Sequence, residues 1–307
     1  MTAATPDALA PDAGTAGRHP PSATSASSRS RLTLAMLAPS TLWFLLLLVM
    51  PMLIILVFSF GERSAVGGYA GGVTLANYLN LGSRAAAFGN TLILAPLGTL
   101  VCLVAAYPLA YFLAVRAGRN RSLLLTLVIV PFWTSFLIRT YAWIFILSGK
   151  GIPALLASVG LEGVRLINTP WAVLIGIVYG YLPLMVFPIY VSLEKLDKRL
   201  LEASHDLGAG TLETFRRITL PLSAPGIITG VMLVFILLMG EFLIPAILGG
   251  GKVFFVGNAL VDLFLQSRNW PFGSAVAMTL VAVMLAIIGL YMKLVARYGG
   301  KPGEGAL

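Results

Sequence analysis

A hydrophilic stretch between two long apolar segments reads Glu202-Ala203-Ser204-His205-Asp206-Leu207-Gly208, and after nine further residues it continues as Ile218-Thr219-Leu220-Pro221. Side chains three or four positions apart share a face of a helix. Apolar or small residues recur at such spacings in two runs: Leu200, Leu201, Ser204 and Leu207, then Leu212, Phe215 and Ile218. The stretch therefore combines charged residues with two apolar stripes.

Local signals divide this stretch into two parts. Gly208 and Gly210 suit the end of a first helix, where a left-handed backbone is needed. Thr211 is a suitable N-cap for a second helix, with Glu213 in its first turn and Pro221 at its end. The sequence predicts two short helices joined by a glycine bend.

Leu207, Leu212 and Phe215 are predicted to face water in this loop. An exposed apolar patch on a loop usually marks a partner surface. The alternative is that these side chains pack on the chain's own membrane helices.

The spacing Glu-Ala-Ala, three residues, Gly, nine residues, Ile-x-Leu-Pro is typical of the inner-membrane permease subunits of binding-protein-dependent ABC importers, and this stretch resembles it. Ser204 replaces the second alanine, a small change at a site that needs a slim side chain. The resemblance implies a type I ABC importer permease fold, in which the loop is a coupling helix seated on the ATPase subunit. The residues expected to couple to the ATPase are Glu202, Ala203, Ser204, Asp206, Leu207, Gly208, Leu212, Phe215, Ile218, Leu220 and Pro221.

The composition is that of an integral membrane protein. The chain has 307 residues, of which 58% are hydrophobic and 11% charged, and its mean hydropathy is +0.91. Basic residues beside apolar spans account for the net charge of +9 without nucleic acid. The single cysteine, Cys102, lies in an apolar segment, so neither an intrachain disulfide nor a cysteine metal cluster is expected.

Six apolar segments are long enough to cross a hydrocarbon core of about 30 Å as helices. They are Leu34 to Phe60, about Thr91 to Val115, Ser122 to Leu147, Trp171 to Val191, Ser223 to Leu248 and Pro271 to Val295. The predicted organisation is a disordered cytoplasmic tail at 1–30, a six-helix permease domain at 31–299 with the coupling loop at about 192–222, and a cytoplasmic tail at 300–307.

Lysine and arginine counts predict the orientation. Fourteen lie in the N-terminal tail, the second and fourth connections and the C-terminus, against six in the other connections, and Arg139 lies inside the third span. The positive-inside rule then places both termini and the Glu202 loop in the cytoplasm. The resemblance implies that the spans lie in the cytoplasmic (inner) membrane of a bacterial cell.

Further stretches are similar to the spermidine/putrescine branch of this family. They are Pro131 to Trp143, Gly240-Glu241-Phe242-Leu243-Ile244-Pro245 with Leu248-Gly249-Gly250, and Arg268-Asn269-Trp270-Pro271. The resemblance implies a permease that imports polyamines. It also implies a second permease, favoured to be a paralogue, two ATPase subunits and an extracytoplasmic binding protein seated on the connections at about 61–90, 148–170 and 249–270.

Two charged residues lie within predicted spans, where a charge at the bilayer centre costs about 2.5–3.5 kcal/mol. Glu241 is predicted to line the substrate path and attract a cation. The alternatives are a buried pair between Arg139 and Glu241, or Arg139 bonded to carbonyl groups of a kinked helix.

Aromatic side chains could attract ammonium groups along the path. Trp133, Tyr141, Trp143 and Tyr181 are the candidates for the path, with Tyr179 beside them. Anchoring at the membrane boundary and packing in the core are the competing roles.

Several activities are excluded on the residue inventory. Gly249-Gly250-Gly251-Lys252 is followed by Val253, so no G-x-x-x-x-G-K-[ST] motif exists and ATP hydrolysis must occur in another chain. The two histidines, His19 and His205, lie outside the spans and supply no protease motif. No catalytic residue, metal or cofactor is predicted. The alternatives are the same machine for an amino-acid derivative, an opine, sulfate or ferric ion, or a standalone channel or secondary carrier.

Overall fold

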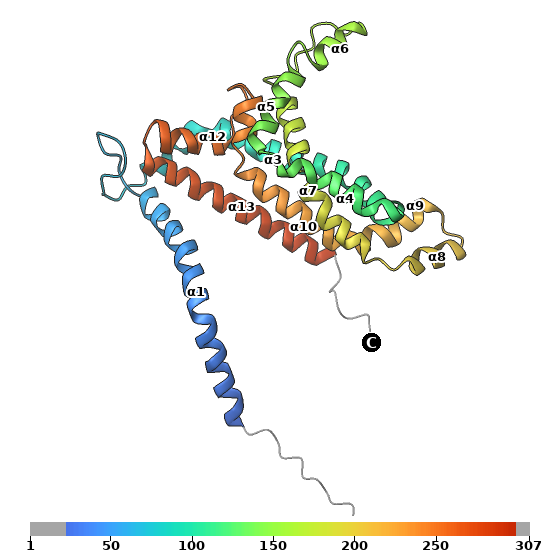
Figure 1. Ribbon diagram of the computed structural model, residues 1–307. Coiled ribbons are helices and arrows are strands. Elements are labelled where there is room, and N and C mark those ends of the chain that lie inside the picture. Colours follow the sequence, from blue (N-terminus) through green and yellow to red (C-terminus); the bar gives the residue numbers. More distant parts are fainter. Residues whose placement is uncertain (1–22, 299–307) are drawn as a thin grey trace, which may run out of the picture. The chain divides into compact units, whose positions relative to one another are not determined.

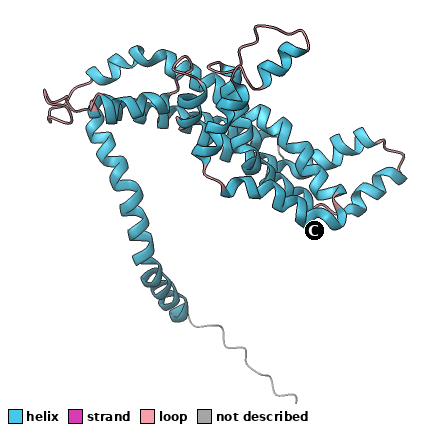
Figure 2. Ribbon diagram, turned by 45° about the horizontal axis from the view of Figure 1, so that its top comes forward, coloured by secondary structure: helices cyan, strands magenta, loops and turns pink. Residues whose placement is uncertain are grey.

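The computed structural model describes residues 23–298. Helices dominate it (Figures 1 and 2), and the β pairing within the described range is a single antiparallel bridge between Arg63 and Tyr69. The all-α class is confirmed. The chain divides between Leu53 and Ile54 into two units, the first of which holds most of α1 (Ala23–Ser59).

Six helical segments of the described chain are long and apolar enough to cross a membrane, which confirms the predicted number. They are Met36–Ser59, Ala76–Arg116, Phe136–Ser158, Pro170–Glu194, Thr211–Met239 and Trp270–Ala296, and a shorter apolar helix covers Val256–Gln266.

The second unit follows α1 with α2 (Ala76–Leu79), the 3-10 turn η1 (Asn80–Arg84), α3 (Ala85–Tyr111), the π-turn η2 (Phe112–Arg116) and η3 (Gly118–Asn120). It continues with α4 (Arg121–Ile129), η4 (Val130–Trp133), α5 (Phe136–Leu147), α6 (Ile152–Ser158) and α7 (Pro170–Glu194). The remaining elements are α8 (Lys198–Asp206), α9 (Thr211–Thr214), the π-turn η5 (Phe215–Thr219), α10 (Leu220–Met239), α11 (Leu243–Leu248), α12 (Val256–Val261), the π-turn η6 (Asp262–Gln266) and α13 (Trp270–Tyr298).

Helix α7 is the centre of the second unit. It packs along both α3 and α10, and its side chains Ile177, Met185 and Ile189 are fully buried. A helix that is apolar on nearly all sides is suited to such a buried position. Figure 1 shows α8 and α9 at the end of the bundle where α7 finishes, and α6 at the end where α7 begins.

Close helix packing in this unit depends on glycine. A Cβ atom on Gly226 of α10 would lie 2.4 Å from the carbonyl oxygen of Pro188 in α7. A Cβ atom on Gly176 of α7 would lie 2.6 Å from Leu248 Cδ1 in α11. The missing side chains therefore let these helices approach, as small residues do at helix interfaces in membranes.

The third predicted span is wrong as a continuous helix. Residues 121–147 form α4, η4 and α5, with an extended backbone at Thr134 between η4 and α5. Pro131 has no N–H for the helical ladder, and the Thr134 hydroxyl bonds the Pro131 carbonyl oxygen at 2.7 Å instead. The apolar run that can span at this place is Phe136–Ser158.

The fifth predicted span is also broken. Helix α10 ends at Met239, and α11 starts at Leu243 after an irregular step at 240–242. The Glu241 carboxylate accepts the backbone N–H groups of Leu243 and Ile244, so a new helix begins there.

Two other predicted boundaries change. Helix α1 begins at Ala23, so residues 23–30 are helical and not part of a disordered tail, while the predicted tail residues 1–22 and the C-terminal residues 299–307 lie outside the described range. The connection at 249–270 contains α12 and η6, whose residues Val256 to Ala259 are buried. The sequence analysis predicted no helix in this connection.

Connections that the charge count assigned to the same side of the membrane are joined by side-chain contacts, in each of the two groups. Arg121 forms a salt bridge with Glu194 near the end of α7. At the start of α3, Arg84 pairs with Asp262 at 2.9 Å, and Arg63 donates to the Ser267 carbonyl oxygen at 2.7 Å. The connections that the charge count grouped together thus share an end of the second unit.

Candidate functional site

The first helix of the loop, α8, has a complete set of end signals. Asp197 caps its start by accepting the Arg199 N–H at 3.0 Å. At its end, the Gly208 N–H donates to the His205 oxygen and the Ala209 N–H donates to the Ser204 oxygen, with φ of +82° at Gly208. These two bonds form a Schellman motif, which requires a left-handed residue. The predicted glycine bend is confirmed at Gly208.

Ser204 joins the two helices of the loop. Its hydroxyl is buried, donates to the Leu201 carbonyl oxygen at 2.8 Å and lies 2.8 Å from the Thr214 hydroxyl. A small side chain is needed there, as predicted, because α8 and α9 meet at this point. The sequence did not indicate Thr214, whose polar side chain gives no signal by itself.

An exposed face extends over both helices. Leu207 and Leu212 are 88% and 73% exposed, and Glu202, Ala203, Asp206 and Gly208 are exposed beside them. Water-facing leucines at the tip of a loop have no role in the chain's own core. This surface can accept a partner without any rearrangement of the loop.

Phe215 does not face water, contrary to the prediction. Its ring is partly buried on α3, with its centroid 5.6 Å from that of Tyr107 and 6.4 Å from that of Tyr111, both edge to face. Tyr107 also hydrogen-bonds Ser223 at 2.9 Å. Aromatic pairs in this geometry attract each other beyond simple burial. For Phe215, packing on the chain's own helix is the correct alternative.

The second helix begins and ends differently from the prediction. Gly210 occupies the N-cap position and Thr211 is the first helical residue. Pro221 does not end the helix, because α9 continues through η5 into α10. In the π-turn the Leu220 N–H donates to the Phe215 oxygen, and this wider turn accommodates a proline that lacks an N–H. Ile218 is partly buried, and Leu220 and Pro221 are exposed.

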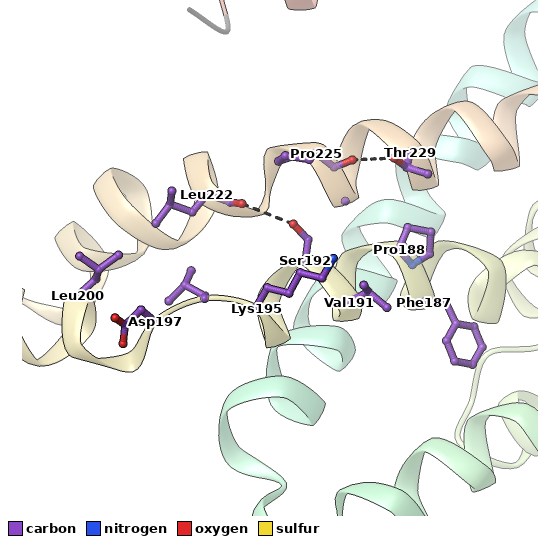
Figure 3. A pocket seen from close by; sticks show the side chains of 12 residues that line it. Phe187, Pro188, Val191, Ser192, Lys195, Asp197, Leu200, Leu222, Pro225 and Thr229 are labelled. Atoms are coloured by element: carbon purple, nitrogen blue, oxygen red, sulfur yellow. Dashed lines mark hydrogen bonds between the residues drawn. The ribbon is translucent and has the colours of Figure 1, made fainter. Parts of the chain in front are cut away.

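A groove of about 810 Å³ lies beside the loop, between the end of α7 and the start of α10. Figure 3 shows Pro188, Ser192 and Lys195 on one side and Leu222 and Pro225 on the other. The two prolines free carbonyl groups, and Thr229 donates to the Pro225 oxygen at 2.8 Å. The charged lining residues are Lys195 and Asp197, of opposite sign, so the groove as a whole does not select cations.

Glu241 is buried and fully engaged with groups of its own chain. It is 6% exposed, and its carboxylate accepts the Leu243 N–H at 2.7 Å, the Ile244 N–H at 3.1 Å and the Tyr181 hydroxyl. A carboxylate at a helix start is favoured by the unpaired N–H groups and by the helix dipole. It therefore caps α11.

Arg139 is 8% exposed, and the described residues include no ion pair between it and Glu241. The proposed buried pair was wrong. Arg139 Nη1 donates instead to the Pro131 carbonyl oxygen at 3.0 Å, which is the predicted alternative of a bond to a broken helix. Its Cζ atom lies 5.4 Å from the ring centroids of Phe132 and Phe136 and 5.6 Å from that of Tyr179.

The aromatic path candidates separate into two groups. Trp133 and Tyr141 are exposed. Tyr181 is buried at the edge of Phe136, and Trp143 lies edge to face with Tyr179 at 5.3 Å. Phe132 and Phe136 were missed by the sequence analysis, although they flank Trp133 and precede Arg139 by seven and three positions.

The chain is similar in sequence to known membrane transport proteins. The family model for the binding-protein-dependent transport system inner membrane component matches residues 106–298. The spermidine/putrescine transport system permease proteins PotB of Haemophilus influenzae and Escherichia coli are each 43% identical over 256 residues. These alignments cover 82% of the chain and 90% and 93% of the two relatives.

Solved structures resemble the fold. The crystal structure of a bacterial alginate ABC transporter, in complex with an alginate pentasaccharide-bound periplasmic protein, contains a chain that matches with a TM-score of 0.72 at 19% identity. The match covers 91% of this chain and 99% of the other. A second crystal structure, of a transporter that imports alginate, matches with a TM-score of 0.70 at 20% identity. At this identity the likeness concerns the fold alone.

Proposed function

The chain belongs to the binding-protein-dependent transport system inner membrane components, and on this premise we propose that it is a permease subunit of an ABC importer for spermidine and putrescine. The observation that carries the proposal is the 43% identity to the PotB permeases over 82% of the chain. The chain itself is a transport subunit and not an enzyme. ATP hydrolysis belongs to a separate ATPase.

The loop formed by α8 and α9 is the site of coupling to that ATPase. Leu207 and Leu212 supply an exposed apolar contact, with Glu202, Ala203, Asp206 and Gly208 around it. Ser204 holds α8 against α9 through Thr214, so the loop moves as one body. Phe215, Ile218, Leu220 and Pro221 connect it to α3 and α10, which carry the movement into the membrane.

The substrate path runs along the face that carries Trp133 and Tyr141. Both side chains are exposed on this chain, and aromatic faces attract ammonium groups. Trp143 lies two residues after Tyr141 on α5 and so points to another side of that helix, where it contacts Tyr179 of α7. Glu241 and Tyr181 fix the start of α11 and in this way support the path from its buried side. Arg139 lies next to the path.

The assembly contains a second permease, a paralogue of this chain, two ATPase subunits and an extracytoplasmic binding protein. Both termini and the Glu202 loop face the cytoplasm, because fourteen of the twenty-one lysine and arginine residues lie in segments of that side. The binding protein then meets the opposite end, where Arg84 and Asp262 pair.

Reconstitution tests this function directly. The assay uses liposomes that contain the chain, the second permease and the ATPase, together with the binding protein. ATP is supplied on the side of the membrane where the ATPase lies, and uptake of labelled spermidine is measured. We expect uptake that requires both ATP and the binding protein. Sulfate, ferric ion or an amino-acid derivative carried in place of polyamines would contradict the cargo, and uptake by this chain alone would contradict the machine.

A further inference from the structure

Three aromatic rings surround the guanidinium group of Arg139. Phe132 comes from η4, Phe136 from α5 and Tyr179 from α7, and all three ring centroids lie 5.4–5.6 Å from Arg139 Cζ. We call these three rings the aromatic cage. Aromatic cages of this kind bind organic cations, including substituted ammonium groups.

The rings of the cage provide much of the stabilisation of this buried charge. A guanidinium has five N–H donors, and Arg139 uses one side-chain donor for a hydrogen bond, to Pro131, among the described residues. A buried charge without a counter-ion is costly, and cation–π contacts offset part of this cost. Ring faces are therefore the principal partners of the Arg139 charge.

The buried carboxylate of Glu241 forms no ion pair with this cation. Glu241 is reached from the cage through Phe136 and Tyr181, whose rings lie 6.1 Å apart. Its two oxygens already accept two backbone N–H groups and the Tyr181 hydroxyl. The cage holds its cation without an acid, and so it binds by ring faces and not by a salt bridge.

The cage is open on the side of the aromatic path. Arg139 itself is buried, but Phe132 and Tyr179 are more than one-third exposed, and Trp133, the last residue of η4, is 84% exposed. The exposed parts of Phe132 and Tyr179 are the access that the cage offers to a second cation.

We propose that the aromatic cage is an exchangeable cation site, which the Arg139 guanidinium fills at rest and an ammonium group of the cargo fills in transit. This rests on the proposed polyamine cargo. When an ammonium group of the cargo replaces the Arg139 guanidinium, the rings still hold a cation, so the cage is never empty. The ring faces then take the place of the water that the ammonium group loses. Arg139 thereby limits how long the cargo is retained.

Removal of the resident cation tests the exchange. Arg139→Met keeps a long apolar side chain and removes the charge. The melting temperature of the complex of the two permeases and the ATPase, without the binding protein, is measured with spermidine, with guanidinium chloride at low millimolar concentration, or with neither. We expect each cation to raise the melting temperature of R139M by about 2–4 °C and to leave the unsubstituted complex unchanged. Thr140→Ala is the matched control, because it removes a buried bond to the Phe136 oxygen on the same helix but leaves Arg139 and the rings. It should show no response.

Two outcomes would overturn the proposal. A folded R139M complex that responds to neither cation has no cation site, and a response to guanidinium alone means that the cage accepts only the head group of arginine. A response to both cations in a complex that transports no polyamine supports the cage and contradicts the cargo instead.

A second variant covers the case in which R139M does not assemble. Tyr179→Leu removes one ring at the exposed rim, and Trp171→Leu removes an exposed ring from the start of the same helix. We expect Y179L to lower the maximal rate of spermidine uptake at least threefold, with the half-saturating concentration of loaded binding protein unchanged. W171L should retain the rate. Equal rates for the two variants would contradict the proposal.

Discussion

At the scale of single residues, the partner of a polar side chain decides its role. Ser204 occupies a position where the family pattern has alanine, and its hydroxyl is engaged by Thr214 across the loop. Glu241 is charged and lies in an apolar sequence, which suggested a contact with a cation. Its three donors instead make it the cap of α11.

Substitution of Glu241 separates capping from charge. Glu241→Gln keeps an oxygen that accepts the Leu243 and Ile244 N–H groups, whereas Glu241→Ala leaves them unpaired. We expect the free energy of unfolding to fall by about 1 kcal/mol for Gln and about 2–3 kcal/mol for Ala, measured by thermal melting in detergent.

Glu162→Ala, an exposed position outside the helices, is the control for that series. If the carboxylate acts on the cargo, both Glu241 variants would lose spermidine uptake to the same extent while E241Q keeps its melting temperature. That result would contradict a purely capping role.

At the scale of elements, helix ends and helix interruptions shape the parts of this chain that carry function. The Schellman motif at Gly208 turns the loop back so that Leu207 is exposed, and the breaks at 134–135 and 240–242 place Arg139 and Glu241. The π-turns η2 and η5 lie close to the contact of Phe215 with Tyr111. Wide turns of this kind often occur at functional places in helices.

The bend at Gly208 allows a test with a matched pair. Gly208 has φ of +82° and Gly210 has φ of −70°, and a Cβ atom would meet no neighbour within 4 Å at either position. Gly208→Val should reduce ATP-driven uptake at least tenfold, because a β-branched residue strains the left-handed backbone on which the coupling face depends.

Gly210→Ala should leave uptake within twofold of the unsubstituted transporter. The measurement is spermidine uptake in proteoliposomes, with ATPase binding followed separately by co-purification. Full coupling in a folded G208V variant would show that the bend is dispensable.

Helix spacing at Gly226 gives a second test at this scale. Gly226→Ala places a Cβ atom against Pro188 of α7, and overpacking of this kind costs about 1–3 kcal/mol. We expect a lower melting temperature of the purified chain. Gly289→Ala in α13, where a Cβ atom meets nothing within 4 Å, should leave it unchanged. Equal melting temperatures would mean that α7 and α10 move apart freely.

At the scale of the whole molecule, charge and hydropathy work together. The six apolar spans require a membrane, and the basic residues near the Glu202 loop predict which side of the membrane the loop faces. The exposed apolar tip of this loop is the surface that the proposed ATPase would contact.

Cysteine labelling tests this orientation. Cys102 is fully buried, and it is first replaced by serine or alanine to remove the native thiol. In that background, His205→Cys should react with a membrane-impermeant maleimide only in inside-out vesicles. Val66→Cys, at the opposite end, should react only in right-side-out cells. The reverse pattern would contradict the cytoplasmic placement of the loop.

The sequence by itself determined the membrane class, the number of spans, the loop with its glycine bend and the family, because hydropathy, charge and turn chemistry are local properties of the chain. The sequence analysis did not predict the breaks in the third and fifth spans. Local bonds at Pro131 and Glu241 form these breaks, but the bonds of the same two groups to Arg139 and to Tyr181 exist only in the folded chain. The positions of Phe215 and Arg139 were likewise decided by tertiary structure. Whether a ring or a charge faces water, a neighbouring ring or a partner depends on helices that are distant in sequence, and their packing sets it.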